Sequence, residues 1–291
     1  MRTTSAPVSR KTAGIRCLIA TAATFLVSLS CSTFPLIADT AAGLRAFRQQ
    51  DYATAAREWQ AAAAQGDKDA QYNLGLLYLK GLGVRTNATE AFRLLRAAAM
   101  QGQVNAQFQV GQMREKGHGI SQDYVDAQHW YQLAANRGDT DAENGLAWLY
   151  EEGYGVQKDL TRAVYWYRKA AEQGLPEAQY RLAQLLERGR GTTRDEAEAA
   201  SLYQRAAQAG YAPAQARLGE NYESGRGIPE NPRNACFWLT LAARQSDAQA
   251  AKSKSRACAK LSPGEAANTE RAAADWKPKL VAPPAPTPDR E

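Results

Sequence analysis

The segment Ala70-Gln71-Tyr72-Asn73-Leu74-Gly75, followed by Gly81-Leu82-Gly83-Val84, indicates a repeat protein because its residue types return every 36 positions. The alanine column is Ala70, Ala106, Ala142, Ala178 and Ala214, and the second loop glycine is Gly83, Gly119, Gly155, Gly191 and Gly227. Five copies follow one another without insertion or deletion: repeats 1 to 5, at 67–102, 103–138, 139–174, 175–210 and 211–246. A fixed period of about 20 to 50 residues is typical of a solenoid. We therefore predict an all-α solenoid of about five 36-residue helical hairpins.

Each repeat has the pattern of two helices joined by a glycine-rich loop. In repeat 1, Ala70, Leu74, Leu77 and Tyr78 recur at the spacing of one helix face and predict a core stripe. The Gly-x-Gly pair supplies the positive φ with which helices end. The second helix is predicted to begin at a column of capping residues, which are Asn87, Asp123, Asp159, Asp195 and Asn231. A column of small residues predicts close helix packing, and its members are Gly75, Gly111, Ala147, Ala183 and Gly219.

These motifs resemble the Sel1-like repeat, a longer relative of the tetratricopeptide repeat. The resemblance rests on Leu74-Gly75 with Tyr78, on the loop Gly81 to Val84, and on the A-x-x-W-Y-x-x-A-A pattern from Ala163 to Ala171. It covers roughly residues 42 to 246. The resemblance implies a right-handed superhelical array and scaffold or adaptor roles, including regulation of envelope complexes.

Atypical segments flank the repeats. We expect an N-terminal capping half-repeat at 39–66, C-terminal capping helices at 247–277, and a disordered Pro-rich tail at 278–291. Cys236 and Cys258 each lie 11 residues from a turn expected near Asp247. At ~1.5 Å per helical residue they would stand level across an antiparallel hairpin. We predict a disulfide between them; two buried free thiols are the alternative.

Residues 1–38 have the pattern of an export signal peptide. A basic region through Arg16 precedes the apolar run from Cys17 to Leu29, and we expect cleavage after Ala38. The apolar run is short of the ~20 residues that a membrane span needs. We therefore expect a periplasmic or secreted protein, with membrane contact only through an uncleaved signal or a lipidated Cys31.

The charge balance argues against nucleic acid as a partner. Four of the 36 Lys and Arg residues lie in the leader, which leaves 32 basic against 30 acidic residues in the remainder. Such a near-neutral chain has no strong attraction to polyanions.

We expect the protein to be a monomer.

No residue pattern indicates catalysis, a metal or a cofactor. The two histidines, His118 and His129, have no metal-ligand spacing. The motifs of serine β-lactam hydrolases are missing, so that activity, associated with some proteins of the family, is the least favoured function. The Gly-x-Gly pairs follow no strand and precede no Lys-Ser/Thr, so we interpret them as helix ends rather than phosphate loops.

Variable positions on the first helices, turned away from the core stripe, are the candidate partner-binding surface. We predict a groove formed by Leu76, Gln112, Trp148, Arg181, Arg188 and Arg217. Trp148 is a candidate anchor because binding hot spots favour Trp and Arg, although it could instead pack against a neighbouring helix. The predicted function is an exported, non-enzymatic interaction scaffold or adaptor that binds a protein or peptide in this groove and regulates an envelope complex. Binding of a cell-wall glycan or peptide is the alternative.

Overall fold

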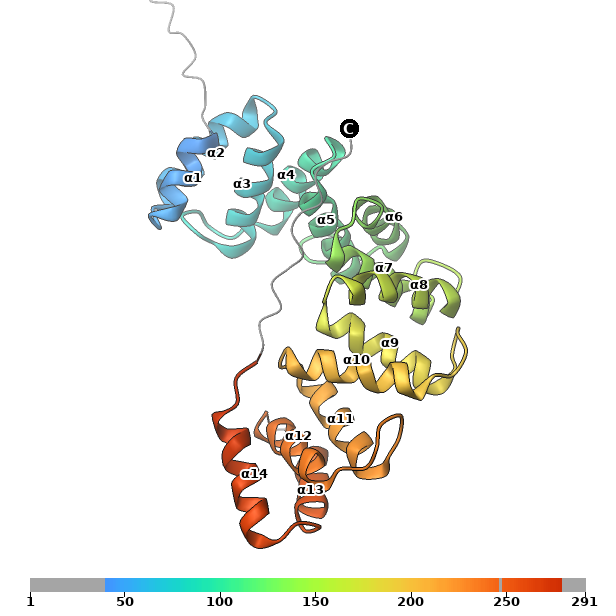
Figure 1. Cartoon of the computed structure of the whole chain (residues 1–291). Helices are drawn as coiled ribbons and strands as arrows, with labels where there is room; N and C mark the ends of the chain where they lie inside the picture. The colour runs from blue at the N-terminus through green and yellow to red at the C-terminus, as the bar shows by residue number, and fades with distance from the viewer. Residues whose placement is uncertain (1–39, 246–247, 279–291) are drawn as a thin grey trace, which may run out of the picture. The chain divides into compact units, whose positions relative to one another are not determined.

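The chain folds into α-helices throughout the part that the structure, a computed structural model, describes: residues 40–245 and 248–278. These residues form 14 helices and no strand, which confirms the predicted all-α array of hairpins (Figure 1). The predicted leader with its cleavage site and Cys31, the turn near Asp247, and the tail from residue 279 onward lie outside the described residues.

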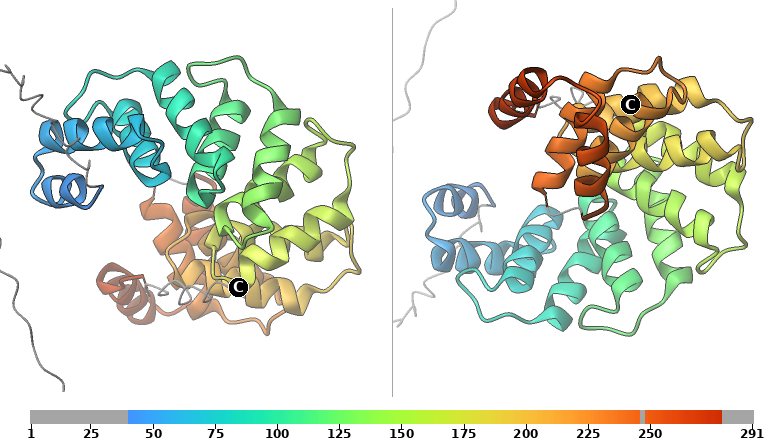
Figure 2. Two further views of the ribbon diagram at one scale, coloured as in Figure 1. Left: turned by 90° about the horizontal axis from the view of Figure 1, so that it is seen from above. Right: turned by 90° about the horizontal axis from the view of Figure 1, so that it is seen from below.

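The helices pair in chain order. A first pair, α1 (Thr40–Arg48) and α2 (Tyr52–Ala64), precedes the five repeats. The repeats contain α3 (Lys68–Lys80) and α4 (Ala88–Met100), α5 (Val104–Lys116) and α6 (Tyr124–Ala135), α7 (Thr140–Glu152) and α8 (Leu160–Glu172), α9 (Pro176–Arg188) and α10 (Glu196–Gln208), and α11 (Ala212–Ser224) and α12 (Pro232–Arg244). Two further helices, α13 (Ala248–Cys258) and α14 (Pro263–Asp275), both pack on α12. Each hairpin stands beside the next (Figure 2).

The predicted helix ends are present. All five Asx side chains accept hydrogen bonds from first-turn amides of the second helices. The first loop glycine of repeat 1, Gly81, has a φ of 68° and closes α3 with a hydrogen bond to the carbonyl of Leu77. At Gly83, an added Cβ would lie 2.3 Å from the carbonyl carbon of Tyr52. The second glycine therefore lets the loop rest on the start of the preceding second helix.

Small residues on the first helix face large residues on the second. A Cβ added at Gly111 would lie 2.6 Å from Cδ1 of Tyr131, so the two helices approach as closely as a glycine permits. In repeats 2 to 4 this large residue is a buried tyrosine, and its hydroxyl donates to a glutamate of the first helix. The three pairs are Tyr131 and Glu115 at 2.6 Å, Tyr167 and Glu151 at 2.9 Å, and Tyr203 and Glu187 at 3.1 Å.

The predicted disulfide joins α12 to α13. Cys236 and Cys258 form the bond with their Cα atoms 4.8 Å apart. Cys236 is fully buried, and Ala235, Leu239 and Ala257 belong to the core cluster around it. The bond therefore ties the last repeat to the helix that covers its open side.

We expect removal of this disulfide to destabilise the C-terminal end of the array. Closing a loop over a sequence separation of 22 residues lowers the entropy of the unfolded chain by an amount worth about 3 kcal/mol. Denaturant unfolding of a Cys236→Ala, Cys258→Ala double variant should show this loss, with reduced hydrogen-exchange protection in α12 and α13. Reduced wild-type protein is the control and should match the variant; equal stability of oxidised and reduced protein would contradict the expectation.

Candidate binding surface

Each predicted groove residue lines one of three hollows beside the first helices of the described hairpins. Leu76 lines an apolar hollow beside α1 and α3. Gln112, Trp148 and Arg181 line a recess formed by α5, α7 and α9, which we call the central recess. Arg188 and Arg217 line a hollow between α9 and α11, which we call the charged hollow. The structure thus brings three of the six predicted residues together in one site.

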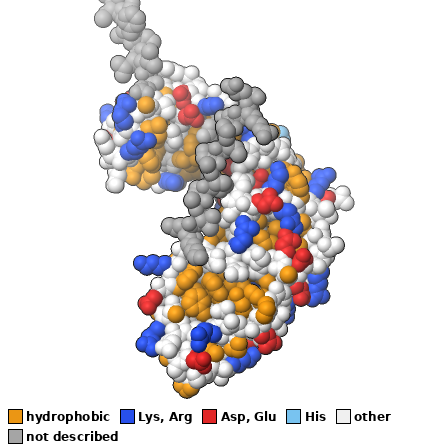
Figure 3. All heavy atoms as spheres, in the orientation of Figure 1, with side chains coloured by type: hydrophobic (Ala, Val, Ile, Leu, Met, Phe, Trp, Pro, Cys, Tyr) orange, Lys and Arg blue, Asp and Glu red, His pale blue; other side chains and the backbone are white. Residues whose placement is uncertain are grey.

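The apolar hollow is small. It has a volume of about 90 Å³ and is lined by side chains that include Leu44, Phe47, Leu76 and Leu82. Leu44 is 38% exposed and Phe47 39% exposed, and apolar side chains gather around α1 and α3 in the space-filling view (Figure 3). The hollow offers apolar contact at the start of the array but few polar groups to orient a ligand.

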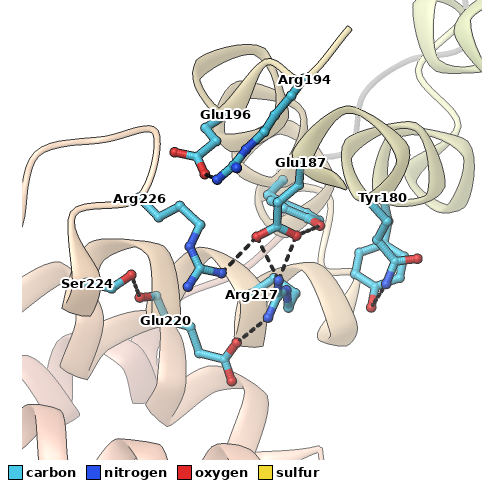
Figure 4. A network of polar contacts seen from close by, with 10 residues as sticks. Tyr180, Glu187, Arg194, Glu196, Arg217, Glu220, Ser224 and Arg226 are labelled. Atoms are coloured by element: carbon cyan, nitrogen blue, oxygen red, sulfur yellow. Dashed lines mark hydrogen bonds and ion pairs between the residues drawn. The ribbon is translucent and has the colours of Figure 1, made fainter. Parts of the chain in front are cut away.

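The charged hollow is largely neutralised by internal ion pairs (Figure 4). Arg217 donates to Glu187 at 2.6 Å and to Glu220 at 2.8 Å, and Arg226 donates to Glu187 at 3.1 Å. Burial alone would raise the pKa of Glu187, but the hydrogen bonds and charges of the arginines outweigh burial and lower this pKa. Arg217 therefore links repeat 4 to repeat 5. Contact of Arg217 with a partner stays a prediction.

Arg188 differs from Arg217. It is exposed at the end of α9, and among the described residues it has no ion pair. It is the charged side chain of this hollow that remains available to another molecule.

The central recess has a volume of about 320 Å³ and spans three consecutive repeats. Helix α5 contributes Phe108 and Gln112, α7 contributes Asn144 and Trp148, and α9 contributes Arg181. Tyr131 and Tyr167 of the second helices also line it. The recess therefore combines aromatic, amide and charged side chains from different repeats.

The recess exists because repeat 3 departs from its neighbours. In repeat 2 the ring of Phe108 stacks on Tyr131 at 5.8 Å between centroids, and in repeat 4 the ring of Tyr180 lies 5.7 Å from that of Tyr203. The equivalent position in repeat 3 is Asn144, and Gly145 follows it. Two small residues leave open the space that an aromatic and a longer side chain fill elsewhere.

Asn144 lies outside the variable columns that predict the groove, and Gly145 lies in one of them but is not among the six predicted groove residues. Large side chains in those columns indicate Trp148 instead. The available signal was the opposite one, a column of Tyr72, Phe108, Asn144, Tyr180 and Ala216 in which an aromatic is lost in the middle of the array.

Trp148 both packs internally and lines the recess. Its ring is half-buried and lies 5.2 Å from that of Tyr154 and 6.4 Å from that of Tyr124, which stack on each other at 4.8 Å. The packing alternative is therefore correct in part. These contacts fix the orientation of the indole at the edge of the recess.

Acidic groups outnumber basic ones around the recess. Its charged lining residues are Glu115, Asp141, Glu177, Lys116 and Arg181. Burial raises the pKa of Tyr131, and Glu115 and then aspartates raise it further. Burial also raises the pKa of Tyr167, followed by Glu151 and opposed by Arg181. Burial is the main cause of both shifts, and the nearby acidic groups add to it.

One buried acceptor in the recess has no partner. The side-chain oxygen Oδ1 of Asn144 is inaccessible to solvent and accepts no hydrogen bond from any described residue. Because an unsatisfied buried polar atom costs free energy, most such atoms are paired in folded proteins. Asn144 therefore costs repeat 3 some stability where other repeats carry an aromatic side chain.

The described residues contain no cluster that could hold a metal ion. No group of three or more His, Cys, Asp or Glu side chains converges within 40–245 and 248–278. His118 and His129 are both exposed. No helix in the same ranges is long and apolar enough to cross a membrane.

The stacked hairpins and the recess between them define a repeat scaffold. Sequence comparison matches the Sel1 repeat family at residues 68–103, 104–139, 140–175, 176–211 and 212–247. The chain therefore belongs to the Sel1 repeat family, whose members are scaffolds for interactions with other proteins. Each matched segment begins one residue after the repeat that we defined from the sequence.

Solved structures similar to this chain include two further Sel1 repeat folds. A Sel1 repeat protein from Oxalobacter formigenes is 32% identical with a TM-score of 0.70, over 84% of this chain and 98% of that chain. The protein c5321, a protective antigen of uropathogenic Escherichia coli strains with an SLR fold, is 27% identical with a TM-score of 0.56. That match covers 79% of this chain and 59% of the antigen. Comparison with curated proteins finds no match.

A buried glutamate replaces a glutamine in repeat 3. In the other repeats the side chains of Gln71, Gln107, Gln179 and Gln215 donate to the carbonyl eight residues earlier, at 3.1 to 3.3 Å. Repeat 3 has Glu143, which is 2% exposed and accepts from Gln173 at 2.8 Å. Burial raises the pKa of Glu143 from 4.5 to about 7, against the opposing effects of Gln173 and Lys169.

We expect Glu143 to make stability depend on pH. The pKa of Glu143 is higher in the folded chain than in the unfolded chain, so its protonation stabilises the fold. This stabilisation is complete below pH 4.5 and is lost as the pH rises through about 7. Glu143→Gln should therefore be more stable than wild type at pH 8 by about 1 to 3 kcal/mol, with little difference at pH 4.5. Denaturant unfolding at both values measures this.

The matched variant Gln179→Glu places a carboxyl at the same position of repeat 4. It should lose stability between the same two pH values. Parallel pH profiles for wild type and Glu143→Gln would show that Glu143 does not titrate in this range.

Proposed function

We propose that this chain is an exported, non-enzymatic scaffold or adaptor that binds a protein or peptide in the central recess. The observation that carries the proposal is the loss of the aromatic side chain at Asn144, which opens a recess lined by groups from three repeats. Family membership supports the broader role, since Sel1 repeat proteins are interaction scaffolds. Regulation of an envelope complex is the role we propose for the bound state.

The central recess is favoured over the other hollows by its polar groups. The charged hollow engages Arg217 and Arg226 in pairs with Glu187, and the apolar hollow has about 90 Å³. In the central recess, Lys116, Glu177 and Arg181 form no ion pair with any described residue. A peptide offers both backbone hydrogen bonds and charged side chains to such groups.

Export is supported by the disulfide. Structural disulfides persist in oxidising compartments and are rare in the cytosol of most organisms. The bond between Cys236 and Cys258 therefore fits the export signal that we expect at residues 1–38.

A second candidate, binding of a cell-wall glycan, is favoured by the aromatic cluster beside the recess. Tyr154 is 42% exposed and lies next to Trp148 and Tyr124. Aromatic rings of this kind can cover the apolar face of a sugar. Binding of a charged peptide should weaken with salt, whereas stacking of a glycan should depend on salt only weakly.

We expect a photo-crosslinker in the recess to capture a protein partner in the cell envelope. p-Benzoylphenylalanine at Gln112, which lines the recess, should give a discrete adduct. The same group at His129, exposed on α6 and outside the three hollows, is the control. Trp148→Ala and Arg181→Ala should each reduce the adduct. Equal adducts from both crosslinker positions, or an adduct that both substitutions leave unchanged, would contradict binding in the recess.

We also expect the purified protein to hydrolyse the β-lactam nitrocefin no faster than buffer. The sequence lacks the nucleophile motifs of serine β-lactamases, and both histidines are exposed. Turnover that persists through purification would overturn the assignment as a scaffold without catalytic activity.

A further inference from the structure

The structure contains an internal example of a guanidinium bound at a Tyr–Glu pair. Between repeats 4 and 5, Nη2 of Arg217 donates to both carboxylate oxygens of Glu187, at 2.8 and 2.6 Å. Its guanidinium carbon lies 6.0 Å from the ring centroid of Tyr203, whose hydroxyl donates to the same glutamate. A planar cation is therefore held by a carboxylate and an aromatic face together.

Between repeats 2 and 3 the same pair is present without its arginine. Tyr131 donates to Glu115 at 2.6 Å, just as Tyr203 donates to Glu187. The residue equivalent to Arg217 is Gly145, which has no side chain. A Cβ added there would lie 2.9 Å from Cε2 of Tyr131. The tyrosine ring therefore leaves no room for a side chain at position 145.

The empty position opens into the central recess. Glu115, Tyr131, Asn144 and Gly145 all line it. Within the described part of the chain Glu115 forms no ion pair, and its carboxylate accepts a hydrogen bond only from the hydroxyl of Tyr131. A donor that entered the recess would find a carboxylate that can accept further hydrogen bonds.

We infer that the central recess takes an arginine side chain of the bound peptide, with its guanidinium on Glu115 and Tyr131 as Arg217 lies on Glu187 and Tyr203. The inference rests on the proposed function and specifies the chemistry of the partner. A guanidinium can bind both carboxylate oxygens of Glu115 because its donors form a planar fork. Lys116 and Arg181 at the border of the recess face the peptide carbonyls or acidic residues that flank the arginine.

Other occupants fit the recess less well. A lysine ammonium is a compact charge that cannot bind a carboxylate in the bidentate way and gains less from an aromatic face. An aromatic side chain would cover Tyr167 but give the carboxylate of Glu115 no charged donor beside the hydroxyl of Tyr131. Citrulline has the shape of arginine without its charge, so it separates charge from fit.

Peptides that differ at one position test the inference. The probes are acetyl-Gly-Gly-X-Gly-Gly-amide with arginine, lysine, citrulline or phenylalanine at X. Binding is followed by ¹⁹F NMR of protein labelled with 5-fluorotryptophan, in which the signal of Trp148 is assigned by its loss in Trp148→Phe. The arginine peptide should shift this signal, and the lysine, citrulline and phenylalanine peptides should bind about tenfold more weakly or not at all.

Two glutamate variants in the same column provide the matched comparison. Glu115→Gln removes the carboxylate in the recess and should weaken the arginine peptide about tenfold. Glu151→Gln makes the same change at the tyrosine pair of repeat 3, where Tyr167 donates at 2.9 Å, and should leave binding unchanged. Comparable thermal unfolding of the two variants shows that both remain folded.

The inference would be overturned by no shift with the arginine peptide, by equal binding of the arginine and citrulline peptides, or by full binding of the arginine peptide to Glu115→Gln. Tighter binding of the phenylalanine peptide would overturn it as well and assign the recess to an aromatic side chain. If the crosslink from position 112 persists in such a case, the proposed function stands and only the arginine is wrong. If the arginine peptide does not bind and the crosslink from position 112 is also lost, the proposed function is wrong as well.

Discussion

The close approach of the two helices in each hairpin sets the geometry of the whole array. A small residue on the first helix faces a large residue twenty positions later, as Gly111 faces Tyr131 and Gly219 faces Leu239. Only glycine or alanine occupies the small position, which fixes the spacing of the pair. In repeats 2 to 4 the same contact brings a tyrosine hydroxyl to a glutamate of the first helix. A packing constraint thus places a polar pair at a regular interval along the array.

Differences among these pairs determine what the surface offers. The carboxylate of Glu187 forms ion pairs with Arg217 and Arg226. It therefore contributes to stability by joining repeat 4 to repeat 5. At Glu115 the equivalent arginine is Gly145, and the adjacent aromatic is Asn144, so the same framework becomes a recess. We therefore propose that the binding site lies where small residues break the repeat pattern. The regular repeats around it form a rigid scaffold.

Most of the fold could be predicted from the sequence, but much of the site could not. The period, the Asx caps and the disulfide between Cys236 and Cys258 follow from local spacing and helix geometry. The pairing of Arg217 with Glu187 joins residues 30 apart on different repeats and needs the register of neighbouring hairpins. The recess forms where side chains are small or missing, so the pattern of large side chains in the sequence does not indicate it. The leader and tail lie outside the described residues.

Restoring the missing aromatic side chain at position 144 tests whether the open recess is the binding site. In Asn144→Phe the new ring should lie on Tyr167 as Phe108 lies on Tyr131, closing the recess while the fold is kept. Ala216→Phe makes the matched change in repeat 5. With the partner captured from position 112, calorimetry should show affinity reduced about tenfold or more for Asn144→Phe and unchanged for Ala216→Phe. Unchanged affinity of a folded Asn144→Phe variant would contradict the account.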